Sequence, residues 1–213
     1  MHIKHNELIS AFSHLLGAIG ILVGSIFLLM ACDGRGDMIT VCLIYTACGI
    51  LMFLASFIYH AEKREENQNN IWRKLDHIAI FVMIAGSYTA LCYICLPLTI
   101  ALWIIIAQWI LVALGVFYKV FWIKGPRFLS SLIYVLMGSM IIVPIGDLLD
   151  LMSTLELWLL IGGGLAYTIG AVLYALKKPR LVPNFFSFHE VFHIFVLIGA
   201  AMHWAVVYMG LLT

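Results

Sequence analysis

Apolar residues form seven long runs, separated by short polar or turn-rich connections. Each run can supply roughly 20 residues of helix, enough to cross a hydrocarbon core about 30 Å thick. Because backbone groups have no water to bond in lipid, the runs are predicted to be helices. We place them near residues 8–31, 39–60, 75–96, 98–121, 128–148, 154–176 and 187–211. The pattern predicts an all-α membrane protein, a seven-transmembrane helix bundle, and the short links predict one domain over residues 1–213.

The composition supports a membrane protein. Of the 213 residues, 64% are hydrophobic and 11% are charged, whereas a soluble domain is about half apolar and about a quarter charged. The net charge of +1 gives no case for nucleic-acid binding, which needs a clustered basic surface. Membrane lipid is therefore the partner we expect, as substrate or ligand.

The basic residues predict the orientation in the membrane. With seven spans, the amino terminus and the second, fourth and sixth links share one side, which holds every one of the 12 Lys and Arg residues except Arg35. Loops rich in Lys and Arg stay in the cytoplasm. We therefore expect the amino terminus in the cytoplasm, the carboxyl terminus outside, and the chain in the inner or plasma membrane.

The five cysteines lie within or at the ends of apolar runs, and their odd number argues against a disulfide framework. Cys92 and Cys95 form a CxxC motif, which is found in redox and metal sites. Because no soluble redox fold surrounds it, we interpret this pair as two small apolar residues at the end of a membrane helix.

Two histidines four residues apart, His189 and His193, open the last apolar run. On a helix this spacing places both imidazoles on one face, one turn apart. Imidazole is the commonest metal ligand and suits zinc. A single histidine here would more often be a packed, hydrogen-bonded residue, so the interpretation depends on whether the chain supplies further ligands.

Further polar residues gather at the same predicted depth. Ser56 and His60 lie one helical turn apart at the cytoplasmic end of the second run, and Asp76 begins the third. Together, His60, His189 and His193 form a three-histidine zinc set. Three protein ligands with an open fourth position are typical of catalytic zinc, since structural zinc normally has four.

Asp76 is predicted to join this site by holding a water or hydroxide on the metal. Ser56 would donate a hydrogen bond to that water or to the substrate. Considered alone, Asp76 is more simply a helix cap or a first-turn carboxylate, but three convergent histidines favour the metal site.

Glu7, Ser10 and His14 share one stripe of the first helix, because they are three and then four residues apart. They form either a second polar cluster bordering the metal, in which His14 assists catalysis, or a set of caps and hydrogen bonds between helices. Both interpretations stay open at this stage.

Three other polar residues are expected outside the metal site. His77 points about 100° away from Asp76 and is expected to be a packing or interface residue. His203 lies ten residues beyond His193, about 15 Å along the helix axis, too far to bind the same ion. Glu190 lies off the histidine face and is expected to favour the start of its helix.

At these positions the sequence resembles the hemolysin III family, the bacterial branch of the progestin and adiponectin receptor superfamily. The resemblance covers nearly the whole chain in order. It is carried by the motifs Glu7-x-x-Ser10-x-x-x-His14, Ser56-x-x-x-His60, Lys74-Leu75-Asp76-His77, Gly86-Ser87-Tyr88-Thr89, Gly163 to Pro179, and His189-Glu190-Val191-Phe192-His193. Two departures are Ser10, where the family usually has Asn, and Ala90, where proline commonly follows the Tyr-Thr pair.

The resemblance implies a bacterial membrane protein with zinc bound by His60, His189 and His193, contacted by Asp76 through a water, with the Ser56 hydroxyl nearby. The superfamily shares this site with alkaline ceramidases, so a metal-dependent hydrolase of lipid amide or ester bonds is the favoured function. One alternative is a non-enzymatic membrane sensor or regulator whose zinc is structural. The other is a cytolytic, pore-forming protein, as the family name suggests, although the charge bias suits insertion into the producer's own membrane.

Overall fold

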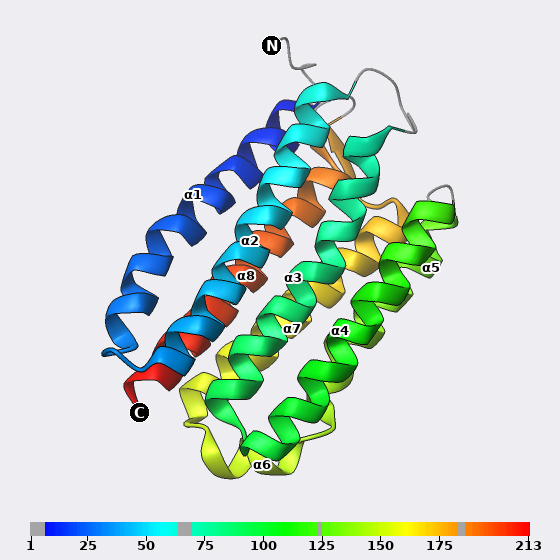
Figure 1. The fold of residues 1–213 in the computed structure, drawn as a ribbon. Coiled ribbons are helices and arrows are strands. Elements are labelled where there is room, and N and C mark those ends of the chain that lie inside the picture. Colours follow the sequence, from blue (N-terminus) through cyan, green and yellow to red (C-terminus); the bar gives the residue numbers. More distant parts are fainter. Residues whose placement is uncertain (1–6, 64–69, 123–124, 183–185) are drawn as a thin grey trace.

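A computed structural model describes residues 7–63, 70–122, 125–182 and 186–213. The long helices run side by side, and the start of α1 and the end of α8 lie at opposite ends of the bundle (Figure 1). The elements are α1 (Leu8–Ala31), α2 (Gly36–Glu62), α3 (Ile71–Cys95), α4 (Leu98–Phe121), α5 (Arg127–Ser139), the 3-10 helix η2 (Met140–Ile142), α6 (Ile145–Leu151), α7 (Thr154–Leu176), β1 (Arg180–Val182), β2 (Phe186–Ser187) and α8 (Phe188–Leu212).

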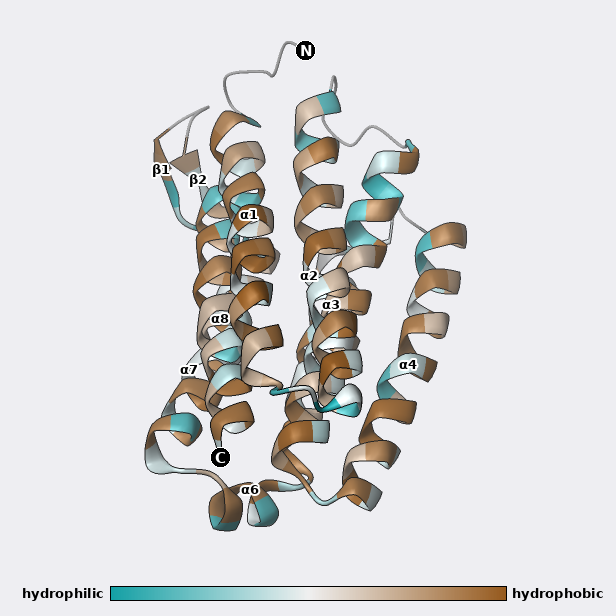
Figure 2. Cartoon of the chain, turned by 60° about the vertical axis from the view of Figure 1, so that its left-hand side comes forward, coloured by the Kyte–Doolittle hydropathy of each residue, from teal (hydrophilic) through white to brown (hydrophobic). Residues whose placement is uncertain are grey.

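The predicted all-α membrane bundle is confirmed. Among the described residues, six helices are long and apolar enough to cross a membrane, and the fifth run forms a bent helix pair that makes a seventh if it is counted as one span. Many large apolar side chains are exposed, and hydrophobic positions, coloured brown, predominate along the long helices (Figure 2). Trp103 and Met30 are more than 70% exposed, which is expected where the solvent is hydrocarbon rather than water.

The prediction of one continuous helix over residues 128–148 is wrong in one respect. The chain bends by 54° between the segment ending at Ile142 and α6. Pro144 stands at this break; it has no N–H to donate and its ring clashes with the preceding helical turn. The Tyr88 hydroxyl of α3 compensates, because it donates to the Gly138 carbonyl and accepts the Ile141 N–H at 2.8 Å.

Local sequence fixes where the helices of the site begin. Asn70 accepts the Arg73 N–H at 3.0 Å and so caps α3. The Glu190 carboxylate accepts the N–H and the hydroxyl of Ser187, at 2.7 and 2.9 Å, at the start of α8. Such caps satisfy backbone donors that a helix leaves unpaired at its first turn.

A short antiparallel hairpin, β1–β2, joins α7 to α8 and was not predicted from the sequence. Its strands have three and two residues, too few for an alternating pattern to stand out. The hairpin lies at the end of the bundle where α8 begins (Figure 1).

Helices α2 and α3 pack closely because α3 carries a glycine at the contact. A Cβ on Gly86 would lie 2.5 Å from the Cys48 Cβ of α2. The contact lies near the middle of both helices. Helix α1 packs against both α2 and α8.

Candidate metal centre

The three histidines expected to bind metal come together. His60 lies in the last turn of α2, and His189 and His193 lie in the first two turns of α8. One ligand nitrogen from each lies within 4.8 Å of the other two. The Nε2 atom of His189 is 3.1 Å from the His60 Nε2 and 3.2 Å from the His193 Nε2. Three nitrogens therefore face one point.

The other nitrogens of two rings are held by oxygen atoms. His60 Nδ1 lies 2.7 Å from a Glu7 carboxylate oxygen, and His193 Nδ1 lies 3.1 Å from the Ser10 carbonyl oxygen. Each Nδ1 is therefore the protonated donor, which leaves a lone pair on Nε2. Metal-binding histidines are oriented in this way by carboxylate and carbonyl acceptors.

The donor set fits a tetrahedral metal. Ligand nitrogens about 2.05 Å from a tetrahedral ion lie roughly 3.3 Å apart, close to the two nitrogen–nitrogen distances of 3.1 and 3.2 Å. His60 and His193 are almost completely buried. Lone pairs converging in a buried place repel one another, so a cation would stabilise them.

Glu7 connects α1 to the end of α2 through two partners. One carboxylate oxygen accepts from His60 and the other lies 2.6 Å from Lys63 Nζ. Burial raises the pKa of Glu7, but the hydrogen bonds from His60 and Lys63 outweigh it, so the pKa lies below its ordinary value. Glu7 is therefore a carboxylate, the form that accepts the His60 N–H.

Asp76 and Ser56 are also neighbours. The Ser56 hydroxyl donates a hydrogen bond to the Asp76 carboxylate, and His60 is close enough to act on that carboxylate electrostatically. Among the described residues, the group of close ligand atoms comprises the three histidines and does not include Asp76. Contact between Asp76 and a metal through a water stays a prediction.

His14 lies directly on the metal centre. Its ring stacks on that of His193, with centroids 3.7 Å apart and planes 17° apart, and its edge meets Phe53. Both ring nitrogens are buried and have no hydrogen-bond partner in the described part of the protein. Buried polar atoms in this state normally bond a water or a ligand.

Ser10 joins α1 to α8. Its hydroxyl donates to Glu190 at 2.9 Å while its carbonyl holds His193. Glu190 thus caps α8, as expected, and also binds α1, which was not expected. Ser13 was missed as well: its hydroxyl lies 3.4 Å from His193 Nδ1, and its position one turn from Ser10 was the available signal.

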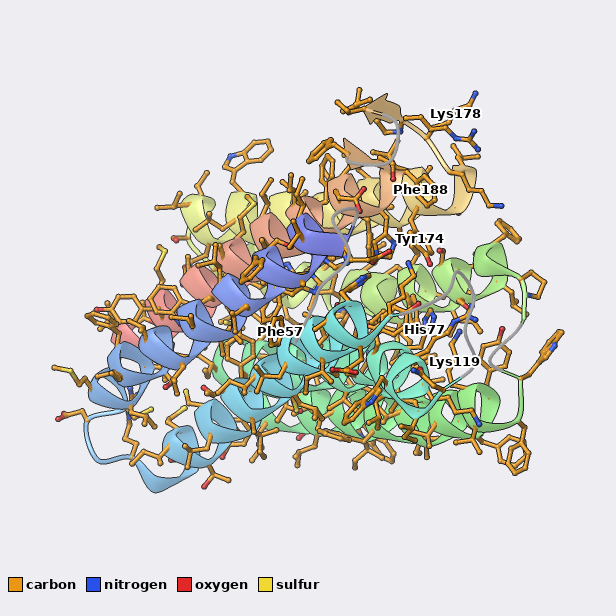
Figure 3. All side chains as sticks on the ribbon, turned by 90° about the horizontal axis from the view of Figure 1, so that it is seen from above. Phe57, His77, Lys119, Tyr174, Lys178 and Phe188 are labelled. Atoms are coloured by element: carbon orange, nitrogen blue, oxygen red, sulfur yellow. The ribbon has the colours of Figure 1, made fainter. Side chains whose placement is uncertain are left out.

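Aromatic rings from α7 and α8 cover His189. The Tyr174 ring centroid is 5.5 Å from that of His189 and 5.9 Å from that of Phe188. Seen from the end of the bundle, Tyr174 and Phe188 lie on the α7–α8 side, and His77 and Lys119 lie on the opposite side (Figure 3). Tyr174 was not predicted to belong to the site.

Two histidines lie outside the metal centre, as predicted. The carbonyl of His77 accepts from the Tyr134 hydroxyl at 3.1 Å. His203 lies 3.2 Å from the Leu160 carbonyl oxygen through its Nε2 and packs edge-on against Tyr167. Neither belongs to the group of close ligand atoms in the described part of the chain.

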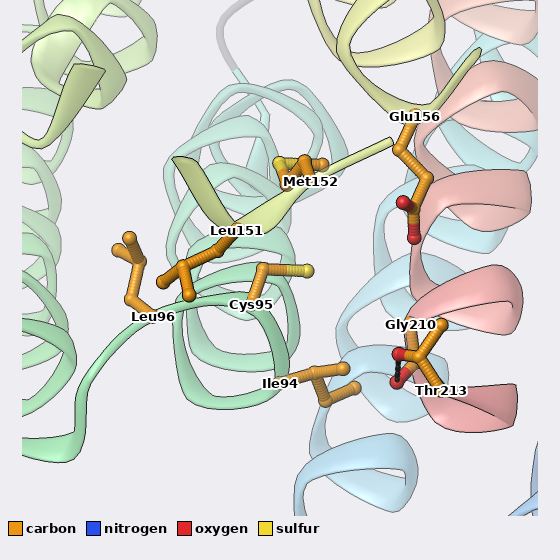
Figure 4. A pocket seen from close by; sticks show the side chains of 8 residues that line it. All are labelled: Ile94, Cys95, Leu96, Leu151, Met152, Glu156, Gly210 and Thr213. Atoms are coloured by element: carbon orange, nitrogen blue, oxygen red, sulfur yellow. Dashed lines mark hydrogen bonds between the residues drawn. The ribbon is translucent and has the colours of Figure 1, made fainter. Parts of the chain in front are cut away.

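A pocket of about 290 Å³ opens at the opposite end of the bundle. Cys95, Met152, Glu156 and Thr213 are among the residues that line it (Figure 4). It lies where α3 and α8 end, whereas the three histidines lie where α2 ends and α8 begins. This pocket is therefore separate from the metal centre.

Comparison with known proteins points to one family. The sequence profile of the family described as "Haemolysin-III related" matches residues 2–204. "Hemolysin-3" of Bacillus cereus is 31% identical over 200 residues, covering 92% of this chain and 87% of the relative. "Hemolysin-3 homolog" of Bacillus subtilis (strain 168) is 29% identical over 197 residues, covering 92% and 89%. The "ADIPOR-like receptor IZH2" of Saccharomyces cerevisiae is 27% identical over 221 residues, covering 93% and 69%.

Proposed function

The chain belongs to the haemolysin-III-related family of multi-pass membrane proteins and is a protein of the bacterial plasma membrane, and from this starting point we propose an activity. We propose that it is a zinc-dependent hydrolase of lipid amide or ester bonds. The observation that carries the proposal is the meeting of three imidazole Nε2 atoms at one point. Structural zinc normally has four protein ligands, whereas three with an open position are typical of hydrolytic zinc.

His60, His189 and His193 would hold the metal, and Glu7 and Ser10 keep two of these imidazoles in the tautomer that binds it. Zinc in such a set supplies Lewis acidity, which activates water for attack on a carbonyl carbon near neutral pH. Imidazole is a neutral ligand, so the positive charge of the ion is not cancelled by its donors. The set therefore suits catalysis of hydrolysis.

The proton transfers fall to Asp76. Its carboxylate is oriented by the Ser56 hydroxyl and lies near His60. In the proposed reaction a carboxylate oxygen of Asp76 takes a proton from the attacking water and then returns it to the leaving nitrogen or oxygen. In this proposal His14, whose ring nitrogens have no partner in the described part of the protein, would donate a hydrogen bond to the carbonyl oxygen as negative charge develops there.

A lipid is the substrate class that this location favours. The histidines lie in the end turns of helices that are apolar enough to cross a membrane, and the charge distribution predicts that this end faces the cytoplasm. A headgroup linkage in that leaflet lies at the same depth. A water-soluble substrate does not concentrate in the membrane, so this location would not favour its binding.

The test combines metal analysis with a lipid assay. Purified protein is expected to carry about one zinc per chain and to release fatty acid from vesicles containing ceramide or phospholipid. The His60→Ala variant is expected to lose both metal and turnover. If zinc-loaded protein releases no fatty acid from any of these lipids, the hydrolase proposal is wrong.

A second candidate is a non-enzymatic sensor or regulator whose metal holds α2 and α8 together. Two observations favour it: His60 and His193 are only 1% and 2% exposed, and the yeast relative is named as a receptor. This candidate expects a large loss of thermal stability in His193→Ala and no turnover by the zinc-loaded protein. The same two measurements therefore separate the candidates.

A further inference from the structure

Two thiols face each other at the end of the bundle opposite the metal centre. The Cys32 Sγ lies 3.7 Å from the Cys42 Sγ, and both residues are fully buried. Cys32 directly follows α1, and Cys42 lies in the second turn of α2. Ten residues separate them along the chain, and the turn between α1 and α2 brings them together.

The backbone around Cys32 is held in place by Arg35. Its guanidinium donates to the Cys32 carbonyl at 3.0 Å, to the Ala31 carbonyl at 3.1 Å and to the Leu211 carbonyl of α8 at 2.6 Å. The two thiols therefore meet on a fixed turn. Bringing the sulfurs from 3.7 Å to a bond length of about 2.05 Å requires a shift of about 1.7 Å, which is within reach of side-chain rotation.

We propose that Cys32 and Cys42 form a disulfide that joins α1 to α2. The charge distribution predicts that this end of the bundle faces outside the cytoplasm, where disulfides persist. Each thiol loses its proton, one S–S bond forms, and the two electrons reduce a protein or small-molecule disulfide to two thiols. Because buried thiols are inert, the exchange precedes the packing of α1 on α2.

A single bond leaves three of the five cysteines as free thiols. Cys48 packs against Gly86 of α3, while Cys92 and Cys95 lie one turn apart near the end of α3. The bond restricts the unfolded chain and should raise the thermal unfolding temperature by on the order of 5 °C. This inference does not depend on the proposed hydrolase function.

The experiment precipitates cells with acid to stop thiol exchange, then alkylates the free thiols with N-ethylmaleimide in denaturant at neutral pH, where the buried cysteines are accessible and reactive. Wild type is expected to show three alkylated cysteines before reduction and five after it. Arg35 is the only trypsin site between Cys32 and Cys42, so the bond should keep the peptide ending at Arg35 joined to the one beginning at Gly36. Alkylation of all five cysteines without reductant would overturn the proposal.

Two serine variants identify the bond. Cys32→Ser is expected to free Cys42, giving four alkylated cysteines before reduction, and to lose the effect of reductant on the unfolding temperature. Cys48→Ser, the matched control, is expected to keep the joined peptides, with two cysteines alkylated. If Cys32→Ser still has two protected cysteines, the bond joins a different pair and the proposal is wrong.

Discussion

The Glu7 carboxylate accepts the Nδ1–H of His60 at 2.7 Å, so the residue that precedes α1 orients a ring at the end of α2. A second bond from Lys63 holds the same carboxylate. Glu7 thus supplies no ligand nitrogen to the three-histidine set, yet its carboxylate determines that Nδ1 of His60 carries the proton. Removing this carboxylate should weaken the site without removing a ligand.

Glu7→Gln should lower metal affinity by about 10- to 100-fold, which is the usual effect of losing a carboxylate behind a ligand histidine. Titration with a zinc chelator of known affinity measures the change. Asp150→Asn makes the same carboxylate-to-amide change on the exposed surface of α6 and should have no effect. Equal affinities for Glu7→Gln and wild type would contradict the assigned role of Glu7.

Asp76→Asn should separate metal binding from catalysis. The variant is expected to keep about one zinc per chain, because the three histidines are intact, and to lose lipid hydrolysis by about 10²- to 10⁴-fold, since an amide takes no proton. Zinc analysis and fatty-acid release are measured on the same sample. Wild-type turnover in this variant would remove Asp76 from the mechanism.

His14→Phe tests whether the ring of His14 acts chemically or only packs. Phenylalanine preserves a ring that can stack on His193 but has no nitrogen to donate. We expect normal zinc content and a fall in turnover of about 10²-fold, the effect of losing one donor to a developing oxyanion. Turnover equal to that of wild type would show that stacking is its whole contribution.

Ser10→Ala should destabilise the contact between α1 and α8. The substitution leaves a buried Glu190 oxygen without its hydroxyl donor, which costs about 1–3 kcal/mol. Thermal unfolding measures the loss. Ser139→Ala, which removes an exposed hydroxyl bonded within its own turn, is the matched control and should change stability by less than about 0.5 kcal/mol.

Gly86→Ala should force α2 and α3 apart, because the new Cβ would lie 2.5 Å from the Cys48 Cβ. Overpacking of this kind costs about 1–3 kcal/mol. Gly164→Ala changes the same residue type within α7 but meets nothing within 4 Å, so it should be neutral or slightly stabilising. Equal unfolding temperatures for the two variants would contradict the close approach.

The sequence predicted the spans well because twenty apolar residues in lipid have few structures open to them other than a helix. It failed at the fifth run, where hydropathy continues across Pro144 but the backbone bends by 54°. Hydropathy measures the preference for lipid and contains no information about missing N–H donors. The proline itself was the signal for the break.

In the metal centre, helical spacing predicted that His189 and His193 share a face, and the charge pattern placed His60 at the same level. The sequence did not predict that the Glu190 carboxylate accepts a hydrogen bond from Ser10 of α1. Spacing gives the direction of a Cβ around one helix axis, whereas a glutamate has three further rotatable bonds. Contacts between helices also depend on how the helices are rotated, which a single sequence does not specify.

The distance along the chain between His60 and His189 affects how the protein is made. They are 129 residues apart, so a ribosome adding about 5–20 residues per second makes His189 roughly 6–26 s after His60. During that interval a nascent chain presents one imidazole of the three and has no chelate to offer an ion. If the three histidines bind a metal as proposed, the full ligand set exists only after the first two turns of α8 have been made.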